Sequence, residues 1–365
     1  MMFPAADYAA RLDSARRVMD AHGVDALMVS VGADMPYLAG YEAPQYERLT
    51  MLVVPGDGEA TLLVPRLEAP AVIDRGAFEI LPWDETDDPV AIALGLAGRP
   101  ATAAIGDHTW ARFLLGMQAQ SPTTRFVPAT PLTSELRAHK DEAEIGWLRT
   151  AGHAADRVAA RLVAERFSGR TEREIAAITR EMIVEEGHEV AAFAIVASGP
   201  NGASPHHEPA DRVIGPGDPV VLDFGGRVMG YFSDTTRDFV VGEPSAAYVA
   251  AYEVLREAQA AAVDAVRPGI AAQDIDRTAR EVITAAGYGE HFIHRTGHGI
   301  GIEVHEEPYI IEGNQRILKP GMAFSVEPGI YVPGQFGMRI EDIVVVTGDG
   351  SEALNLSSRD RYTVE

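Results

Sequence analysis

The chain has 365 residues, 46% of them hydrophobic, and a formal net charge of −23 from 31 lysines and arginines against 54 aspartates and glutamates. This composition supports folded cores rather than disorder, and it lacks the basic surface that binding to nucleic acid requires. Cysteine is absent, which excludes disulfides, a thiol nucleophile and cysteine-ligated metals.

The N-terminal segment predicts neither export nor membrane insertion. Residues 1–17 lack the apolar core of a secretory signal, and no stretch approaches the roughly 18 uninterrupted apolar residues of a membrane span. We therefore expect a cytoplasmic protein without membrane contacts.

The first third of the chain predicts an α/β domain. Helical periodicity over 7–22 stops at Gly23 and is followed by a buried strand over 24–32. The segment 48–65 predicts a β-hairpin, because a Gly-Asp-Gly turn separates two apolar runs. The further expected elements are helices near 87–98 and 109–120 and a strand at 101–107.

Prolines mark the end of this first domain. Pro128 and Pro131 fall within 126–140, which we expect to be a loop because proline interrupts regular structure. The two expected domains are 1–138 and 139–365, and the first contains no catalytic cluster.

The second domain contains an internal repeat at an offset of one hundred residues. Segments 171–189 and 271–289 carry the same amphipathic helical pattern, and long alanine-rich helices at about 141–166 and 244–266 precede them. Each half is therefore expected to contain two helices followed by strands. The matched pairs are Ile175 with Ile275, Arg180 with Arg280, Glu181 with Glu281, Ile183 with Ile283, and Gly187 with Gly287.

Four carboxylates and one histidine are the candidate metal ligands of this domain. Asp223 and Asp234 lie eleven residues apart in a segment that predicts two strands paired across a Gly-Gly turn. Burying several carboxylates among apolar strands is prohibitive unless cations hold them. A carboxylate-rich set with one histidine favours two divalent ions that share oxygens over a structural zinc site. The five candidates are Asp223, Asp234, His298, Glu327 and Glu341.

The duplication explains how these residues would meet. The two aspartates fall in the first half, and the two glutamates fall at nearly the same place in the second half. A pseudo-twofold axis between the halves would bring the two acidic pairs face to face. The sequence thus predicts one metal centre between two similar halves.

Six motifs together resemble those of the pita-bread metallopeptidases, in the proline-directed branch of Xaa-Pro dipeptidases (prolidases) and aminopeptidase P. The motifs are ASGPNGASPHHEP, VLDFGG, YFSDTTRDF, FIHRTGHGIGIEVHEEP, FSVEPGIY and MRIED. The resemblance covers nearly the whole chain. It implies an α/β creatinase-like N-terminal domain and an α+β pita-bread catalytic domain with an internal pseudo-twofold duplication.

The resemblance also implies a role for each candidate ligand. Asp223 would bind one metal, and His298 would help to hold the second together with Glu327. Asp234 and Glu341 would bridge both ions. Manganese is the expected metal, with cobalt or zinc as alternatives, because carboxylate-rich ligation favours it. A hydroxide shared by the ions would be the nucleophile, and Glu327 would accept and pass on its proton.

Three histidines match positions of the family that do not bind metal. His206 and His305 would donate hydrogen bonds to the substrate and to the tetrahedral intermediate. His206 is preferred over His207 because it stands seventeen residues before the first ligand, as in the family. His294 would line the substrate pocket. A structural role is the alternative for each of them.

Other polar residues near the motifs are weaker candidates. Arg339 would orient a ligand carboxylate and, with Tyr231, belong to the substrate-binding set. Tyr231 and Thr236 could likewise orient a ligand carboxylate, but core packing and strand propensity explain the presence of these two residues nearly as well. Tyr309 stands where some prolidases have an arginine, four residues after the second active-site histidine.

The expected function is hydrolysis of the peptide bond before proline in Xaa-Pro dipeptides. The alternative is aminopeptidase P activity on longer peptides. Two further alternatives are a peptide-binding module without catalysis and a creatinase-like hydrolase without metals. The expected partners are short proline-containing peptides and, as is typical of the family, a second copy of the chain in a homodimer.

Overall fold

The chain divides into two compact units, Met1–Arg137 and Ala138–Glu365, and the computed structural model describes residues 7–365. The first unit is an α/β structure around one mixed six-stranded sheet in the order β4-β3-β2-β1-β5-β6. Its strands are β1 (Ala26–Val29), β2 (Met51–Pro55), β3 (Thr61–Pro65), β4 (Glu79–Trp83), β5 (Thr102–Ile105) and β6 (Arg125–Pro128). Its helices are α1 (Tyr8–His22), α2 (Asp34–Ala39), α3 (Pro89–Leu96), α4 (Ala111–Gln120) and α5 (Thr130–Ala138).

Interactions between residues close in sequence determine the ends of several of these elements, as predicted. Asp7 caps α1 by accepting a hydrogen bond from the Ala10 amide, and Gly23 ends the helix in the left-handed conformation. Strands β2 and β3 pair antiparallel and confirm the predicted hairpin.

The segment 126–140 was predicted to be a loop, and this prediction is wrong. Strand β6 occupies its start and α5 most of the remainder. Pro131 is the second residue of α5, where a helix has no partner for the amide that proline lacks. Pro128 ends β6, which lies at the edge of the sheet, where proline removes no ladder hydrogen bond.

The second unit consists of two halves with the same order of elements. The first half contains α6 (Glu142–Leu162), α7 (Glu172–Glu185), β7 (Val190–Ser198), β8 (Pro219–Val228), β9 (Tyr231–Phe232) and β10 (Thr235–Val241). The second contains α8 (Ala246–Ala265), α9 (Ala272–Ala285), β11 (Gly297–Gly299), β12 (Glu306–Ile310), β13 (Ala323–Val326), β14 (Gly329–Val332), β15 (Phe336–Arg339), β16 (Asp342–Val346) and β17 (Ser351–Ala353). The last strand, β18 (Tyr362–Val364), returns to the first half and pairs with β10.

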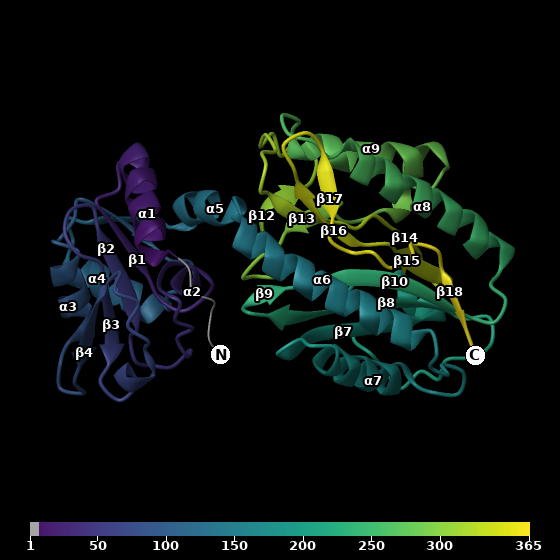
Figure 1. Ribbon diagram of the computed structural model, residues 1–365, viewed down its shortest axis with the longest axis horizontal. Coiled ribbons are helices and arrows are strands. Elements are labelled where there is room, and N and C mark those ends of the chain that lie inside the picture. Colours follow the sequence, from purple (N-terminus) through teal and green to yellow (C-terminus); the bar gives the residue numbers. More distant parts are fainter. Residues whose placement is uncertain (1–6) are drawn as a thin grey trace. The chain divides into compact units, whose positions relative to one another are not determined.

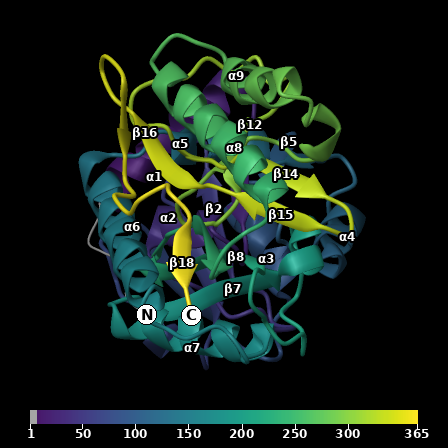
Figure 2. The same ribbon diagram turned by 90° about the vertical axis from the view of Figure 1, so that its right-hand side faces the viewer.

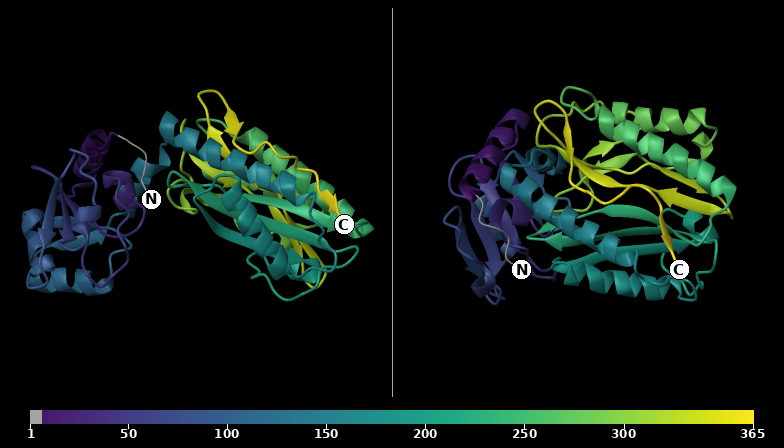
Figure 3. Two further views of the ribbon diagram at one scale, coloured as in Figure 1. Left: turned by 60° about the horizontal axis from the view of Figure 1, so that its bottom comes forward. Right: turned by 45° about the vertical axis from the view of Figure 1, so that its right-hand side comes forward.

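Each half has its own sheet and its own apolar core. The sheets have the orders β18-β10-β8-β7 and β12-β11-β13-β16-β17, and β14 pairs with β15 separately. Helices α6 and α7 pack on the first sheet, while α8 packs on β13 and α9 on β12. Within this unit, α8 and α9 lie on one side of the strands and α7 on the other (Figures 1, 2 and 3). The predicted pita-bread architecture with its internal duplication is therefore confirmed.

Strand β8, which contains Asp223, pairs with β10, which directly follows Asp234, as predicted, but the chain does not turn at Gly225-Gly226. Both glycines lie inside β8, and the chain turns at Met229-Gly230 instead. A Cβ atom on Gly225 would lie 2.2 Å from the carbonyl oxygen of Ser233, so this glycine permits a close approach of two backbones.

A buried ion pair joins the two halves next to the candidate ligands. The Arg237 guanidinium, on β10, lies 2.7 Å from an Asp342 carboxylate oxygen on β16, and neither side chain is exposed to solvent. The same guanidinium donates to the backbone carbonyl oxygen of Glu341 at 2.6 Å. Gln259, on α8, donates to the other oxygen of Asp342. Each charge is therefore compensated inside the protein.

No helix within residues 7–365 combines the length and the apolar character that crossing a bilayer requires.

Removing one partner of this ion pair should destabilise the second unit strongly. We expect Arg237→Leu to lower the free energy of unfolding by about 3 kcal/mol, because the buried charge of Asp342 would lose its buried partner and keep only Arg359, which is partly exposed to solvent. Urea denaturation of the metal-loaded protein measures this loss. The control is Arg173→Leu, which removes an ion pair with Asp211 whose side chains are 65% and 83% exposed. Equal losses in the two variants would contradict the role assigned to the buried pair.

Candidate metal centre

The five candidate ligands come from the central strands of both sheets. Asp223 lies within β8 and Asp234 directly precedes β10, in the first half. His298 is the middle residue of β11, Glu327 follows β13, and Glu341 precedes β16, in the second half. The structure thus brings together residues that are up to 118 positions apart in the chain.

Close packing of backbones sets the position of the histidine. A Cβ atom on Gly297 would lie 1.8 Å from the carbonyl oxygen of Ser325, so only glycine lets β11 lie this close to β13. The Ser325 hydroxyl accepts a hydrogen bond from the His298 amide and donates one to Glu327. One serine therefore aligns two of the candidate ligands.

The ligand atoms form two groups that share one residue. Asp223, Asp234 and Glu341 offer oxygens that lie within 4.8 Å of one another, and so do the ligand atoms of His298, Glu327 and Glu341. A third such group contains Asp234 and His298 with His305 in place of a carboxylate. The first two groups have Glu341 in common, and the third links Asp234 to His298, so the residues predicted to bind two ions lie together.

Two observations test whether these residues fit divalent ions. Asp223 Oδ1 and Glu341 Oε1 are buried, and neither has a hydrogen-bond partner within residues 7–365. His298 Nδ1 lies 3.1 Å from the carbonyl oxygen of Gly299 and must donate to it, so a neutral His298 presents the Nε2 lone pair. Nε2 lies 3.6 Å from Asp234 and 3.2 Å from Glu327. Lone pairs that converge in this way require a cation, so the residues fit.

The carboxylates strongly oppose one another's ionisation. Burial raises the pKa of Asp234 well above its usual range, and the charges of Glu341 and Asp223 raise it further. Burial likewise raises the pKa of Glu341, with Glu327 and Asp223 adding to the effect. Burial also raises the pKa of Asp223, although Arg339 opposes it. Without cations, the cluster would therefore retain protons.

Glu327 differs from the other three carboxylates. Burial by itself would raise its pKa, but interactions with His298 and His294 in their protonated forms, and with Arg339, lower the pKa to about 2 when no cation is bound. Glu327 is therefore ionised near neutral pH.

Arg339 holds two of the acidic residues in position. Its guanidinium donates to Asp223 at 2.6 Å and to the Thr236 hydroxyl at 3.0 Å. The Thr236 hydroxyl in turn donates to Glu341 at 2.7 Å. Arg339 is buried and contacts ligand carboxylates, so its position fits the predicted orienting role.

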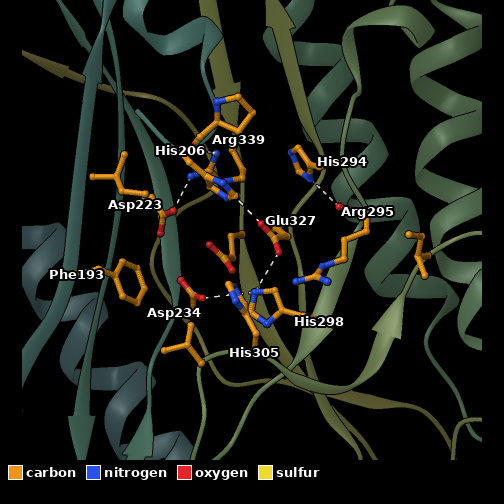
Figure 4. Close-up of a pocket in the computed structure, with 15 residues that line it drawn as sticks. Phe193, His206, Asp223, Asp234, His294, Arg295, His298, His305, Glu327 and Arg339 are labelled. Carbon is orange, nitrogen blue, oxygen red and sulfur yellow. Dashed lines mark hydrogen bonds and ion pairs between the residues drawn. The ribbon is translucent and has the colours of Figure 1, made fainter. Parts of the chain in front are cut away.

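The candidate ligands form part of the lining of a cavity of about 480 Å³. His206 and His305 line it as well, and they lie on opposite sides of the carboxylates in Figure 4. Burial, followed by the positive charges of His298 and Arg295, lowers the pKa of His305 to about 4. His305 is therefore neutral near pH 7. The apolar part of the lining consists of Phe193, Ile195, Pro205, Val304 and Ile311.

His294 lines the cavity, but both nitrogens of its ring are engaged by the protein. Nδ1 lies 2.6 Å from the backbone carbonyl oxygen of Arg295, so it must be the donor. Nε2 then accepts from the Tyr331 hydroxyl, which lies 2.9 Å away and itself accepts from Arg339 at 2.8 Å. Burial lowers the pKa of His294, in keeping with a neutral ring. His294 can therefore offer a substrate its ring surface but no hydrogen bond.

The structure separates the adjacent histidines 206 and 207. His206 lines the cavity, whereas His207 Nε2 lies 2.8 Å from the buried Glu172 carboxylate at the start of α7. Glu172 also accepts from Ser198 and Asn201, which precede both histidines, and from the Ala210 amide, which follows them. His207 thus anchors this loop while His206 faces the cavity.

Tyr231 does not belong to this group of residues. It is buried outside the cavity lining, and its hydroxyl donates to Glu144 on α6 at 2.8 Å. The predicted substrate-binding role of Tyr231 therefore gains no support, because packing and this hydrogen bond account for the residue.

Sequence reasoning missed three residues that shape the site: Glu172, Arg295 and Tyr331. Glu172 is indistinguishable in sequence from other glutamates in the first turn of a helix. Tyr331 is the last residue of the motif that contains Glu327, but only the fold brings its hydroxyl to His294 and Arg339. Arg295 stands within a quoted motif, three residues before His298, and this proximity was the one available signal.

Comparisons with known proteins agree with this geometry. The family model described as "Metallopeptidase family M24" matches residues 146–348, and "Creatinase/Prolidase N-terminal domain" matches residues 11–139. A "Probable dipeptidase PepE" from Mycobacterium tuberculosis is 46% identical over 97% of this chain and 96% of its own length. An "Xaa-Pro dipeptidase" from Pyrococcus furiosus is 34% identical over 96% of this chain and 99% of its own.

A solved structure extends the agreement to three dimensions. Dipeptidase PepE from Mycobacterium ulcerans is 44% identical and matches with a TM-score of 0.95, covering 100% of both chains. The chain therefore belongs to metallopeptidase family M24, with a creatinase/prolidase N-terminal domain, and is a metal-dependent hydrolase, as the motif resemblance predicted.

Proposed function

We propose that this enzyme is a dinuclear metallo-exopeptidase that hydrolyses Xaa-Pro dipeptides. The observation that carries the proposal is the buried set of four carboxylates and His298, whose atoms form two groups with Glu341 in common. The names of the relatives support dipeptides as substrates and a bond before proline as the target.

Asp223, Asp234 and Glu341 would hold one ion. His298 and Glu327 would hold the other, together with Glu341. When bound, two such ions lower the pKa of a water molecule towards neutrality and polarise the substrate carbonyl.

The remaining chemistry belongs to side chains of the cavity. Glu327 is ionised, so its carboxylate can accept a proton from the attacking water and deliver it to the leaving nitrogen. His305 is neutral, so its ring can donate an N–H to the developing oxyanion without requiring a counter-charge. His206 would supply a second donor from the opposite side.

The apolar lining suits the residue on the leaving side of the bond. Phe193 and Ile195, on β7, present apolar surface beside the carboxylates. A pyrrolidine ring can pack against such surface and needs no partner for an amide N–H, which an X-Pro bond lacks. The preference for proline rests on this match and on the names of the relatives.

Three finer predictions accompany the proposed function. Manganese is the proposed ion, because oxygen-rich ligation suits it. A homodimer is proposed on the family resemblance, and a cytoplasmic location is proposed as well.

Removal of the metals should destabilise the protein, and more so at higher pH. The raised pKa values of Asp234 and Glu341 mean that the metal-free folded state keeps protons that the unfolded chain releases. Stability of that state is therefore highest below the usual carboxyl pKa values, and it falls as the pH rises through the raised ones. Bound cations replace those protons.

Thermal denaturation with and without manganese measures this effect. We expect the increase in Tm on adding manganese to grow between about pH 5 and about pH 8. A constant increase over this range would argue against metal binding by these carboxylates.

Replacing a ligand without changing its shape should abolish activity while keeping the fold. Asp234→Asn should lower kcat/KM by more than roughly a hundredfold. Mutating a residue that only hydrogen-bonds to a metal ligand costs up to about a hundredfold, and loss of a ligand should cost more. The metal-free variant should be at least as stable as the metal-free wild type, because one repulsive charge is gone. Asp264→Asn, at an exposed aspartate on α8, is the control. Full activity of Asp234→Asn with bound metal would refute the assignment.

Turnover of defined peptides tests the substrate. Chelator-stripped protein should release alanine from Ala-Pro only after manganese is added, and much faster than from Ala-Pro-Ala. Faster cleavage of the tripeptide would indicate an Xaa-Pro aminopeptidase. No cleavage of either peptide by metal-loaded protein would show that the preference for proline is wrong.

A further inference from the structure

A buried lysine pairs with the residue that follows His305. Of the 31 lysines and arginines, only residues 140 and 319 are lysines. Lys140 lies between α5 and α6, and its ammonium group donates to Glu306 Oε1 at 2.6 Å. The two side chains are 1% and 5% exposed. The Lys140–Glu306 pair therefore connects the start of the second unit to the first residue of β12.

Stability alone does not explain why the chain keeps this pair. Taking two charges out of water costs about as much free energy as their attraction returns, and apolar side chains of similar volume often stabilise such a position equally well. A charged hydrogen bond nevertheless holds its two side chains at one distance and in one direction, which an apolar contact does not. The pair therefore contributes geometry more than it contributes stability.

The backbone of Lys140 is itself anchored to the second sheet. Its amide donates to the carbonyl oxygen of Gly321 at 3.0 Å, and the Gly321 amide donates to the carbonyl oxygen of Val346 on β16 at 2.9 Å. A Cβ atom on Gly321 would lie 2.8 Å from the Lys140 carbonyl oxygen, so glycine permits this close approach. The ammonium group thus extends from a fixed backbone.

The Glu306 carboxylate also packs against the turn between β11 and β12. A Cβ atom on Gly301, within this turn, would lie 2.6 Å from Glu306 Oε1. His305 lines the cavity, whereas Glu306 does not. Successive side chains of an extended segment point to opposite sides. Holding Glu306 in the interior therefore directs His305 towards the cavity.

The ring of His305 lacks the hydrogen bonds that orient the neighbouring histidines. Both nitrogens of His294 are engaged by the protein, and His298 Nδ1 donates to a backbone carbonyl oxygen. His305 is exposed, and among residues 7–365 its ring has no hydrogen-bond partner. Its ring packs edge to face on that of His298, with the centroids 4.1 Å apart. The position of the His305 ring therefore depends on its backbone.

We propose that Lys140 and Glu306 are positioning residues, which together hold the His305 ring where its N–H meets the oxyanion that develops during hydrolysis. This inference rests on the proposed function, which gives His305 that contact. Neither residue of the pair lines the cavity, so both act through the histidine. An oxyanion donor must lie within about 3.1 Å of the oxygen, and a misplacement of about 1 Å costs up to roughly a hundredfold in rate.

The double variant Lys140→Met/Glu306→Gln tests the inference. It removes both charges at nearly constant side-chain length, so no buried charge is left unpaired. In the manganese-loaded full-length protein, kcat for Ala-Pro should fall about tenfold to a hundredfold, while KM stays within about twofold and the metal content stays unchanged. The control is Arg149→Met/Glu352→Gln, which removes an ion pair of the same unit whose side chains are 36% and 42% exposed, and which should keep kcat.

His305→Ala decides whether the loss passes through the histidine. This substitution should lower kcat by about a hundredfold to a thousandfold. Adding Lys140→Met/Glu306→Gln to it should cause no further loss beyond about twofold, because no ring is left to position. Losses that multiply would overturn the inference, as would wild-type kcat in either the double variant or His305→Ala.

A shorter acid provides the same comparison if the double variant does not fold. Glu306→Asp keeps the charge but shortens the side chain by one methylene group, so the Lys140–Glu306 pair cannot form without moving the backbone beside His305. Its kcat for Ala-Pro should fall by at least about threefold, and this loss should disappear in the His305→Ala background. A loss that persists there, or no loss at all, would overturn the inference.

A signal from the ring itself does not depend on turnover. Protein with ¹³C-labelled histidine rings, loaded with diamagnetic zinc, should give one narrow His305 resonance, identified by its absence from His305→Ala. In Lys140→Met/Glu306→Gln this resonance should shift or broaden, while that of His207, which Glu172 holds, should not. If no peptide is cleaved, the proposed function fails, and this resonance alone decides the inference. A broad signal in the wild type, or an unchanged one in the double variant, would overturn it.

Discussion

Mutual repulsion among buried carboxylates is the constraint on which the catalytic unit depends. Asp223, Asp234 and Glu341 meet where the central strands of two sheets face each other, and each has a pKa raised by burial. Apolar residues at these positions would give a more stable core. A chain that keeps acids there stabilises them only when cations are bound, so metal binding and the integrity of this part of the fold are coupled.

The surrounding structure compensates charge in a graded way. Beside the ligands, Arg237 pairs with Asp342, which Arg359 also contacts, and this ion pair joins the two halves. Arg339 contacts a candidate ligand directly, because its guanidinium neutralises Asp223 and aligns the carboxylate. Within the cavity lining, Arg295 stacks on the Tyr309 ring, and the part of the chain that the structure describes gives it no acidic partner. Arginines of the same chemistry thus serve stability at Arg237 and ligand orientation at Arg339, according to which acid lies beside them.

Local signals predicted the secondary structure well wherever neighbours in the chain decide it. The cap at Asp7, the left-handed end at Gly23 and the hairpin of β2 and β3 follow from short-range chemistry. Predictions failed where distant packing decides. Pro131 begins a helix instead of a loop, and Gly225 serves the approach of a second backbone instead of a turn. Neither difference can be read from a window of adjacent residues.

The sequence by itself determined the family, the duplicated architecture and the candidate ligands, because motifs and an offset of one hundred residues are properties of residue order. Only the tertiary structure decided which neighbouring residues share the cavity. It turned His206 inward and His207 onto Glu172, engaged both ring nitrogens of His294, and placed Tyr231 outside. It also stacked the Arg295 guanidinium on Tyr309, the residue that stands where some prolidases have an arginine. The physical reason is that hydrogen bonds and charge act through space, between atoms that the chain order keeps far apart.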